Sequence, residues 1–319
     1  MRHGRNPNTT AQTKPRERIT VGVITHFPNE WQSYHLHRWG VSALSLRSLQ
    51  KHVNLPIHLA IWDNGSHDKF REWLTNEIEP DTLILSENVG KSVARKALFG
   101  MFPPDTIMAI ADDDIFYFPS WLLPQIELLE HFDKAEPKVG TVTGYPVRTM
   151  YRWANDCAKE FGRNHGELVK GSYVTAEWDA DYCASIGREY DWHKKTSGNV
   201  DEYKVIFDGK EALTLGHHCQ FICYNGRIAP LLRWDIDAMA DEKPFDRAVD
   251  EKYMRLCTTQ RLTMHMGNVL DDKLLGLAKK YNLSVTVDHA DTLQPVDGSV
   301  KAGRHAAAVV ATALPEISL

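Results

Sequence analysis

Between residues 19 and 119 the chain alternates short apolar runs with segments of helical periodicity. The apolar runs are rich in β-branched residues and apolar on both faces, as buried parallel strands are. We expect strands at 19–25, 58–62, 82–86 and 106–111. Helices are expected between them, at 34–53, 69–76 and 91–102. This alternation predicts an α/β fold whose mostly parallel central sheet is flanked by helices on both faces.

Polar clusters follow all of these expected strands. They cover residues 25–30, 63–68, 88–95 and 112–114. The carboxyl ends of parallel strands meet at one edge of a sheet, and open α/β sheets bind their ligands just beyond that edge. We therefore expect the clusters to form one ligand site.

The second half of the chain has a weaker pattern, and residues 155–201 show no clear period. The pattern predicts a helix at 120–132, a strand at 139–143, a mixed strand at 214–224, a helix at 249–257 and a strand at 261–265. We expect a single domain over 18–280, with a boundary between its halves at 119/120. A disordered basic arm (1–17) precedes it, and a tail that is poorly ordered or weakly helical (281–319) follows it.

Composition narrows the class of protein. Among 319 residues, 37 Lys and Arg stand against 42 Asp and Glu, a net charge of −5, which argues against a general nucleic-acid coat. The 43% share of hydrophobic residues excludes disorder throughout, and no apolar run is long enough for a transmembrane helix. Five cysteines and a polar N-terminal segment favour a cytoplasmic location. The basic arm leaves peripheral contact with a membrane open.

Three consecutive aspartates, Asp112, Asp113 and Asp114, come directly after an apolar strand. Adjacent carboxylates repel one another, and a hard divalent cation such as Mg²⁺ compensates that repulsion with oxygen ligands. On a pleated strand Asp112 and Asp114 face the same way. We therefore expect these two to bind a cation jointly, with Asp113 pointing elsewhere.

The polar clusters also form an ordered set of motifs. The set comprises Thr25 to Asn29, Asp63-Asn64-Gly65-Ser66-His67-Asp68, Asn88-x-Gly90-x-x-x-Ala94-Arg95, and the aspartates with Pro119. In this order the motifs resemble those of inverting GT-A glycosyltransferases of the family 2 type, as found in bacteria and viruses. The resemblance extends from about residue 19 to residue 268, and it implies the GT-A fold.

The resemblance implies a metal-dependent transfer of a sugar, with inversion, from a nucleotide-diphosphate sugar to an acceptor hydroxyl. The donor would be a UDP-, GDP- or dTDP-sugar, bound by the half at 18–119, and the acceptor would bind at 120–280. The residues implied in donor binding are Thr25, Phe27, Asn29, Asp63, Asn64, Asn88, Gly90, Lys91, Arg95, Asp112 and Asp113. Those implied in binding Mn²⁺ or Mg²⁺ are Asp112, Asp114 and His265.

Inversion needs a base for the acceptor hydroxyl. The resemblance places this base in an E-D-x-x-[LM] element heading a helix, and the nearest match is Asp250-Glu251-x-x-Met254, with the two acids reversed. Residue type favours Asp250 and strict alignment favours Glu251, so both are candidates. The alternative is that Asp250 and Glu251 have only a structural role, in which their negative charge stabilises the N-terminus of a helix.

Other interpretations remain open. A sugar-1-phosphate nucleotidyltransferase would need a glycine-rich loop after the first strand, and THFPNEW has no glycine. A non-catalytic nucleotide-sugar-binding module would keep Asp63 and Asp114. His217 and His218 resemble residues that line the donor sugar. They could instead be a zinc pair, but adjacent histidines on a strand point to opposite faces, which argues against their sharing one ion. The acceptor could be a glycan, a lipid-linked glycan or another polymer, with nucleic acid not indicated.

Overall fold

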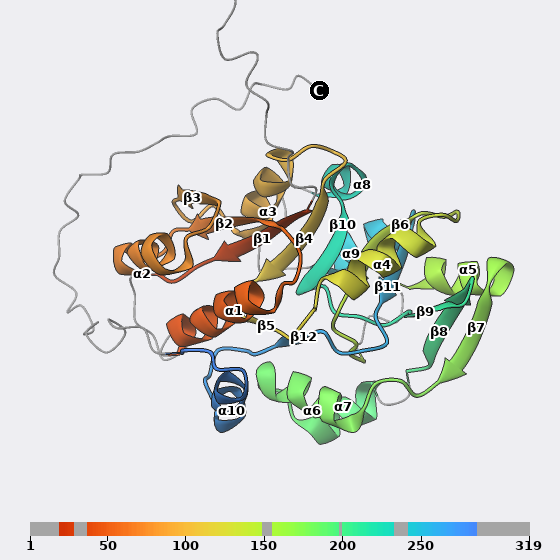
Figure 1. Ribbon diagram of the computed structural model, residues 1–319. Helices are drawn as coiled ribbons and strands as arrows, with labels where there is room; N and C mark the ends of the chain where they lie inside the picture. The colour runs from red at the N-terminus through yellow and green to blue at the C-terminus, as the bar shows by residue number, and fades with distance from the viewer. Residues whose placement is uncertain (1–18, 29–36, 149–154, 198–199, 233–241, 286–319) are drawn as a thin grey trace, which may run out of the picture.

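The computed structural model describes residues 19–28, 37–148, 155–197, 200–232 and 242–285. A ten-stranded mixed sheet runs through this part of the chain in the order β3-β2-β1-β4-β10-β6-β11-β9-β8-β7 (Figure 1). Its strands are β1 (Ile19–Thr25), β2 (His58–Asn64), β3 (Thr82–Ser86), β4 (Ile107–Asp112), β6 (Val139–Thr143), β7 (Glu167–Gly171), β8 (Glu202–Phe207), β9 (Lys210–Leu213), β10 (Gln220–Tyr224) and β11 (Met254–Cys257). A second, two-stranded sheet pairs β5 (Ile115–Tyr117) with β12 (Thr263–His265).

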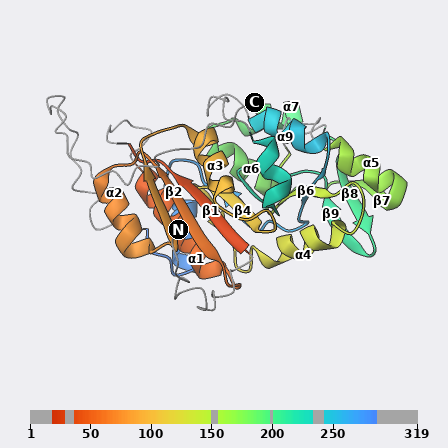
Figure 2. The same ribbon diagram turned by 90° about the horizontal axis from the view of Figure 1, so that it is seen from above.

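The helices lie on both faces of the large sheet. They are α1 (Arg38–His52), α2 (Asp68–Trp73) continued by a π-helical turn (Leu74–Ile78), α3 (Lys91–Gly100), α4 (Leu123–Phe132), α5 (Asp156–His165), α6 (Ala176–Ser185), α7 (Tyr190–Ser197), α8 (Asn225–Ile228) continued by a 3-10 turn (Ala229–Leu231), α9 (Glu242–Asp250) and α10 (Asp272–Lys280). Seen from above, β2, β1 and β4 lie side by side, with α2 at one end of the molecule and α5 with β7 at the other (Figure 2).

Strand β4 shows why the sheet is covered on both faces. Its side chains alternate: Ile107 and Ala109 belong to one apolar cluster with α1 and α4, whereas Met108 and Ile110 belong to another with α3 and α9. Both sets are buried, which explains why the strand is apolar at every position. The predicted α/β class with helices on both faces is confirmed.

The four strands of the first half are parallel to one another, as expected. Beyond them β10 runs antiparallel to both β4 and β6, and the hairpins of β7, β8 and β9 are antiparallel as well. The sheet as a whole is therefore mixed. β10 comes from far along the chain and yet lies directly beside β4 (Figure 1).

Two predictions for the second half are wrong in their bounds. The helix expected at 249–257 ends at Asp250 as α9, and β11 follows it. The strand expected at 214–224 begins only at Gln220, because residues 214–219 form turns and extended chain that pack against β6. Both segments are apolar enough for either structure, so periodicity could not separate them.

The expected arm (1–17) and the tail beyond residue 285 lie outside the described residues. The division into halves at 119/120 stays a prediction. Within the described part of the chain, no helix combines the length and the apolar character that crossing a membrane requires.

Candidate donor-binding site

The ends of β1, β2 and β4 bring the predicted polar clusters together. In the paired strands Thr25 lies opposite Asp63, and Ile24 lies opposite Asp112. These positions are therefore neighbours at one edge of the sheet, where α/β proteins bind ligands.

Asp63 is a hub for hydrogen bonds within the loop that follows β2. Its Oδ2 accepts from Thr25 Oγ1 at 3.1 Å. Its Oδ1 accepts from the backbone N–H of Ser66 at 3.1 Å and from Arg71 Nε at 2.7 Å. Asp63 is fully buried and Arg71 is partly exposed. The carboxylate thus fixes the loop and holds a guanidinium beside the expected nucleoside position, which the sequence did not single out.

The second and third motifs are fastened to each other. Asn64 Nδ2 donates to Asn88 Oδ1 at 3.0 Å, and Asn64 Oδ1 accepts from the N–H of Val89 at 2.9 Å. Gly65 has φ +87, and a Cβ there would lie 2.7 Å from the backbone nitrogen of Asn88. Only glycine allows this approach. The spacing of the two motifs therefore reflects one interlocked pair of loops.

Phe27 and Asn29 were also expected to bind the donor. Phe27 is 2% exposed and stacks on Phe70 at 5.5 Å between ring centroids, so its side chain belongs to the core and not to a ligand surface. Asn29 lies outside the described residues.

Asp112 faces the start of α3. Lys91 Nζ lies 2.8 Å from its Oδ2, and Arg95 lies 3.8 Å from its Oδ1. Gly90 precedes the helix with φ +82, a conformation that favours glycine. The side chains of Lys91 and Arg95 and the N-terminus of α3 thus lie beside the end of β4. A helix N-terminus attracts anions, as these two positive side chains do.

The other two aspartates are held by Arg38, the first residue of α1. Arg38 pairs with Asp113, donates to Asp114 Oδ2 at 2.9 Å and donates to Asn268 Oδ1 at 2.9 Å. The expectation that Asp112 and Asp114 face the same way is wrong, because β4 ends at Asp112 and the pleat does not continue. No motif signalled Arg38, which meets the aspartates only through the tertiary fold.

Burial and neighbouring charges together shift the pKa values of Asp113 and Asp114 in opposite directions. Burial raises the pKa of Asp113 to about 6, although Arg38 and a hydrogen bond from Ser42 oppose the rise. Burial would also raise the pKa of Asp114, but the charges of His265 and Arg38 outweigh it and hold that pKa well below its ordinary value. Asp114 is therefore the firmer anion of the two.

His265 is brought to Asp114 by the small sheet, in which it lies opposite Ile115. Its Nε2 lies 3.5 Å from Asp114 Oδ2, and its Nδ1 is hydrogen-bonded to Ser185 Oγ at 2.8 Å. Asp114 Oδ1 is buried without a hydrogen-bond partner. A carboxylate oxygen left unsatisfied next to an imidazole is a donor set that suits Mn²⁺ or Mg²⁺. Among the residues described, no three acidic, His or Cys side chains already form a metal-binding group.

Asp250 and Glu251 lie elsewhere. Asp250 is the last residue of α9, not the head of a helix, and it accepts from the N–H groups of Asp156 and Cys157 at 3.0 and 3.4 Å. It thereby caps the N-terminus of α5. The hollow that both acids line shares no residue with the aspartate cluster; its other lining residues are Asp156, Cys157, Glu160 and Arg247.

The burial of Asp250 predicts a pH effect on stability. Burial raises the pKa of Asp250 from 3.8 to about 6, although the hydrogen bond from Asp156 opposes it. The folded state then binds this proton more tightly than the unfolded state. The stabilisation from this proton is complete below about pH 4 and is lost as the pH rises from about 4 through 6. The full shift corresponds to about 3 kcal/mol, which solvent screening reduces to about 2 kcal/mol. Urea unfolding between pH 4 and 7 should show this fall in the wild type and a flatter profile in Asp250→Asn. An equal slope in the two proteins would contradict the assignment; Asp272→Asn, at an exposed carboxyl, is the control.

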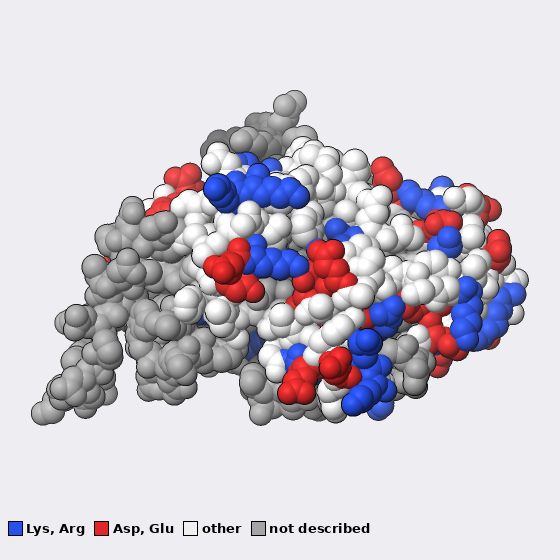
Figure 3. Space-filling model, turned by 90° about the horizontal axis from the view of Figure 1, so that it is seen from below, with Lys and Arg blue, Asp and Glu red and all other residues white. Residues whose placement is uncertain are grey.

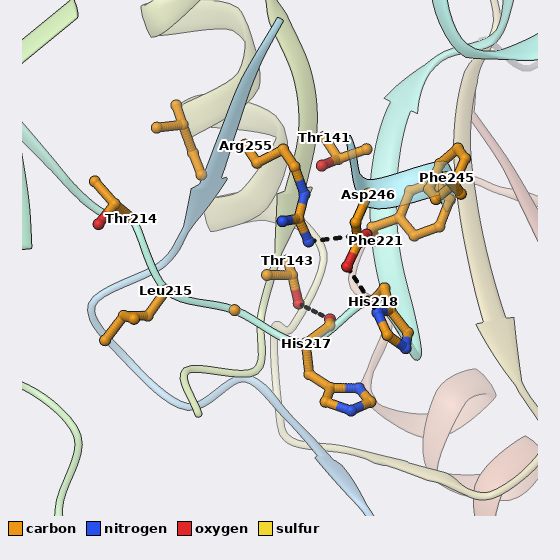
Figure 4. Close-up of a pocket in the computed structure, with 12 residues that line it drawn as sticks. Thr141, Thr143, Thr214, Leu215, His217, His218, Phe221, Phe245, Asp246 and Arg255 are labelled. Atoms are coloured by element: carbon orange, nitrogen blue, oxygen red, sulfur yellow. Dashed lines mark hydrogen bonds and ion pairs between the residues drawn. The ribbon is translucent and has the colours of Figure 1, made fainter. Parts of the chain in front are cut away.

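A second hollow lies between the chain before β10, β6, α9 and β11, and it contains a buried ion-pair network that the sequence did not reveal. Its lining includes Thr143, His217, His218, Asp246 and Arg255 (Figure 4). His218 Nδ1 lies 3.0 Å from Asp246 Oδ2, and Arg255 lies 2.9 Å from Asp246 Oδ1. The rings of His217 and His218 are 4.4 Å apart, so they do not face opposite ways as expected, because they precede β10.

The surface gives no sign of a broad basic region on the side shown in Figure 3. There, Lys and Arg side chains alternate with Asp and Glu among the residues coloured. Among the ion pairs of the described residues, Lys273 pairs with Asp181 and lies 3.9 Å from Glu177.

Comparison with known proteins gives a family match over part of the chain. Residues 43–175 match the family described as Glycosyl transferase family 2. No curated protein matches this chain. A mannosyltransferase, PcManGT from Pyrobaculum calidifontis, solved in complex with GDP-Man and Mn2+, is 14% identical with a TM-score of 0.40, over 82% of this chain and 59% of that one. TarS 1-349 from S. aureus is 10% identical with a TM-score of 0.42, over 86% and 68%. The chain therefore spans less than two thirds of the mannosyltransferase, and these structures assign it no donor or acceptor.

Proposed function

We propose that this chain, whose residues 43–175 match the glycosyl transferase family 2 model, moves a sugar from a nucleotide-diphosphate sugar to an acceptor hydroxyl with inversion. The observation that carries the proposal is the convergence of Thr25, Asp63, Lys91 and Asp112 to Asp114 at one edge of the sheet. The acceptor is a hydroxyl of a glycan, a lipid-linked glycan or another polymer, bound by the half at 120–280.

The nucleoside lies along the loops after β1, β2 and β3 in this proposal. Asp63 holds Arg71 and Thr25 in place for the base, and the joined pair Asn64 and Asn88 shapes the loop beside it. Thr25 and Asp63 are both fully buried. They therefore act mainly by fixing partners that reach the ligand.

The diphosphate lies at the start of α3. Lys91 and Arg95 supply positive charge, Gly90 lets the backbone approach, and the N-terminus of the helix adds its dipole. Without the donor, the side chains of Lys91 and Arg95 lie against Asp112. When the donor binds, Asp112 would accept hydrogen bonds from the ribose hydroxyls instead.

Asp114 and His265 would hold the cation. The buried, unpartnered oxygen of Asp114 and the imidazole 3.5 Å from its other oxygen fit this role. Asp112, which pairs with Lys91, would contribute less directly than the sequence suggested. A bound Mn²⁺ or Mg²⁺ supplies positive charge where negative charge develops on the departing diphosphate. Asp250 and Glu251 stay candidates for the base, and Asp250 would have to give up its cap on α5 to serve.

A ligand panel tests the proposal. We expect UDP, GDP or dTDP, each with Mn²⁺, to raise the melting temperature. A ligand at 100 times its dissociation constant stabilises the folded state by about 2.7 kcal/mol, which is about 5–10 °C for a chain of this size. Asp63→Asn should lose most of this shift, because it loosens Arg71 and Thr25. If none of the three nucleotides raises the melting temperature, the proposal fails.

A further inference from the structure

A large hollow lies between the end of α6 and the chain that runs from β12 into α10. Its volume is about 530 Å³, within the range of about 300–1,000 Å³ that is usual for small-molecule sites. Among the described residues, one wall comes from within 181–187 and the other from within 264–274. Figure 1 shows α6 and α10 below the small sheet of β5 and β12. Both walls therefore belong to the half of the chain in which the acceptor is expected.

His265 connects this hollow with the aspartates. It lines the hollow, and its Nε2 lies 3.5 Å from Asp114 Oδ2. Its Nδ1 is hydrogen-bonded at 2.8 Å to Ser185 Oγ, which also lines the hollow. Asn268, another lining residue, accepts from Arg38, which pairs with Asp114. A ligand in the hollow would thus lie beside the imidazole proposed to hold the cation, close to the diphosphate of the donor.

The lining combines polar groups with exposed apolar side chains. Asp181, Ser185 and Asn268 contribute a carboxylate, a hydroxyl and an amide. Ile186 and Val269 are 38% and 58% exposed, one on each wall. A sugar ring matches such a surface, because its hydroxyls need hydrogen-bond partners and its C–H groups can cover apolar side chains. A purely apolar chain would strip water from the polar groups without replacing their hydrogen bonds, which is costly.

The charges of the lining disfavour an anionic acceptor. Apart from His265, which would face the cation, the described lining carries the carboxylates of Asp181 and Asp271 and the ammonium of Lys273. Lys273 pairs with one oxygen of Asp181, and Arg261 lies 2.5 Å from the other. These partners hold the carboxylate of Asp181 in place, and its remaining lone pairs can still accept from ligand hydroxyls. A phosphate group would meet more negative than positive charge here.

We propose that this hollow binds the acceptor and that the acceptor is a neutral saccharide, free or at the end of a longer glycan. Its reacting hydroxyl lies at the end of the hollow beside His265. The proposal rests on the proposed function and names the class of acceptor for it. Acceptor binding here does not depend on which group takes the proton, and Asp250 and Glu251 line a different hollow.

Transfer to disaccharides tests the proposal. The donors are UDP-glucose, UDP-N-acetylglucosamine and GDP-mannose with Mn²⁺, and the acceptor probes are cellobiose, chitobiose, lactose, maltose and mannobiose. We expect at least one combination to give a trisaccharide, detected by its mass. Val269→Trp and Ile186→Trp each place a large side chain on one wall of the hollow. Each should raise the KM for the disaccharide by roughly tenfold, equivalent to about 1.4 kcal/mol. Both residues are exposed, so the replacements need no room in the core.

Controls separate the possible failures. Met101→Trp adds the same bulk at an exposed residue just after α3 and should behave like the wild type. The rise in melting temperature with UDP and Mn²⁺ shows whether the donor site of each variant is intact, and two variants are used so that the test survives misfolding of either. If both keep this rise and also the wild-type KM for the disaccharide, the saccharide binds elsewhere and the proposal is wrong.

Donor hydrolysis, in which water takes the place of the acceptor, separates the proposal from the function on which it rests. If the wild type hydrolyses a donor but glycosylates none of the disaccharides, the saccharide assignment is wrong. Transfer to a polyprenyl phosphate in their place would assign a lipid acceptor. If the wild type turns over none of the three donors and binds no nucleotide, the proposed function itself fails.

Discussion

Asp114→Asn is expected to lower the turnover of nucleotide sugar by roughly 1,000-fold. Oδ2 of Asp114 is paired with Arg38 and lies 3.5 Å from Nε2 of His265, and Oδ1 is buried without a hydrogen-bond partner. Removing the charge removes the oxygen ligand proposed for the cation, whose effect on the departing diphosphate is worth several kcal/mol. At 1.36 kcal/mol for each factor of ten, a loss of about 4 kcal/mol corresponds to this decrease.

The measurement is donor hydrolysis over a range of Mn²⁺ concentrations. The variant should also lose the Mn²⁺-dependent part of the melting-temperature shift with UDP, while UDP without metal still binds. Asp105→Asn, which alters an exposed carboxyl before β4, should behave like the wild type. Turnover within threefold of wild type, with an unchanged response to Mn²⁺, would remove Asp114 from the metal site.

Arg148→Met should cause the largest loss of stability. Arg148 pairs with Asp179 and with Glu202, and it donates to the carbonyl of Val174 at 2.8 Å. Both carboxylates are almost fully buried, at 1% and 3% exposure. Without the arginine both stay buried with no cationic side chain among the described residues but His193, which lies 3.6 Å from Asp179, while Glu202 keeps only the backbone N–H groups of Tyr173 and Val174. Losing the buried pairing costs about 3–5 kcal/mol. The melting temperature should fall by about 10 °C at 2–4 °C for each kcal/mol.

A triple variant distinguishes lost charge pairing from lost packing. Adding Asp179→Asn and Glu202→Gln to Arg148→Met removes the stranded charges, so at least half of the lost melting temperature should return. Arg163→Met, at an exposed arginine on α5, is the matched control and should change little. If the triple variant is no more stable than Arg148→Met alone, the loss comes from packing and not from unpaired charge.

Strands of the central sheet that are covered on both faces could be predicted from the sequence. The bounds of β1, β3 and β6 are those expected from the apolar runs, because such runs have few alternatives inside an α/β sheet. Residues 155–197 were not assigned, although they form α5, α6 and α7 with β7. Their stability depends on buried ion pairs such as that of Arg148 and Asp179, and polar contacts across the fold leave no periodic signal.

For the candidate site, too, the position of the polar clusters could be predicted from the sequence, but the contacts of their side chains could not. The strand-end clusters could be placed together because parallel strands end at one edge. Which partner each acid takes could not be predicted, because Arg38 reaches the aspartates from α1 through the tertiary fold. The orientation of Asp112 and Asp114 was predicted wrongly for a related reason: the point at which the pleat ends depends on hydrogen bonds such as that between Asp112 and Cys219.

The position of β10 between β4 and β6 affects how the chain can be dissected. The family match ends at residue 175, and β10 and β11 lie beyond it. A fragment cut there would keep β4 and β6 but lose the strand that joins them, leaving a gap in the middle of its sheet with unpaired backbone on both sides. Residues 43–175, which match the family, are therefore not expected to fold as an independent domain. The edge that carries the aspartates is completed by a strand made much later along the chain, so the site can be finished only after most of the polypeptide has been synthesised.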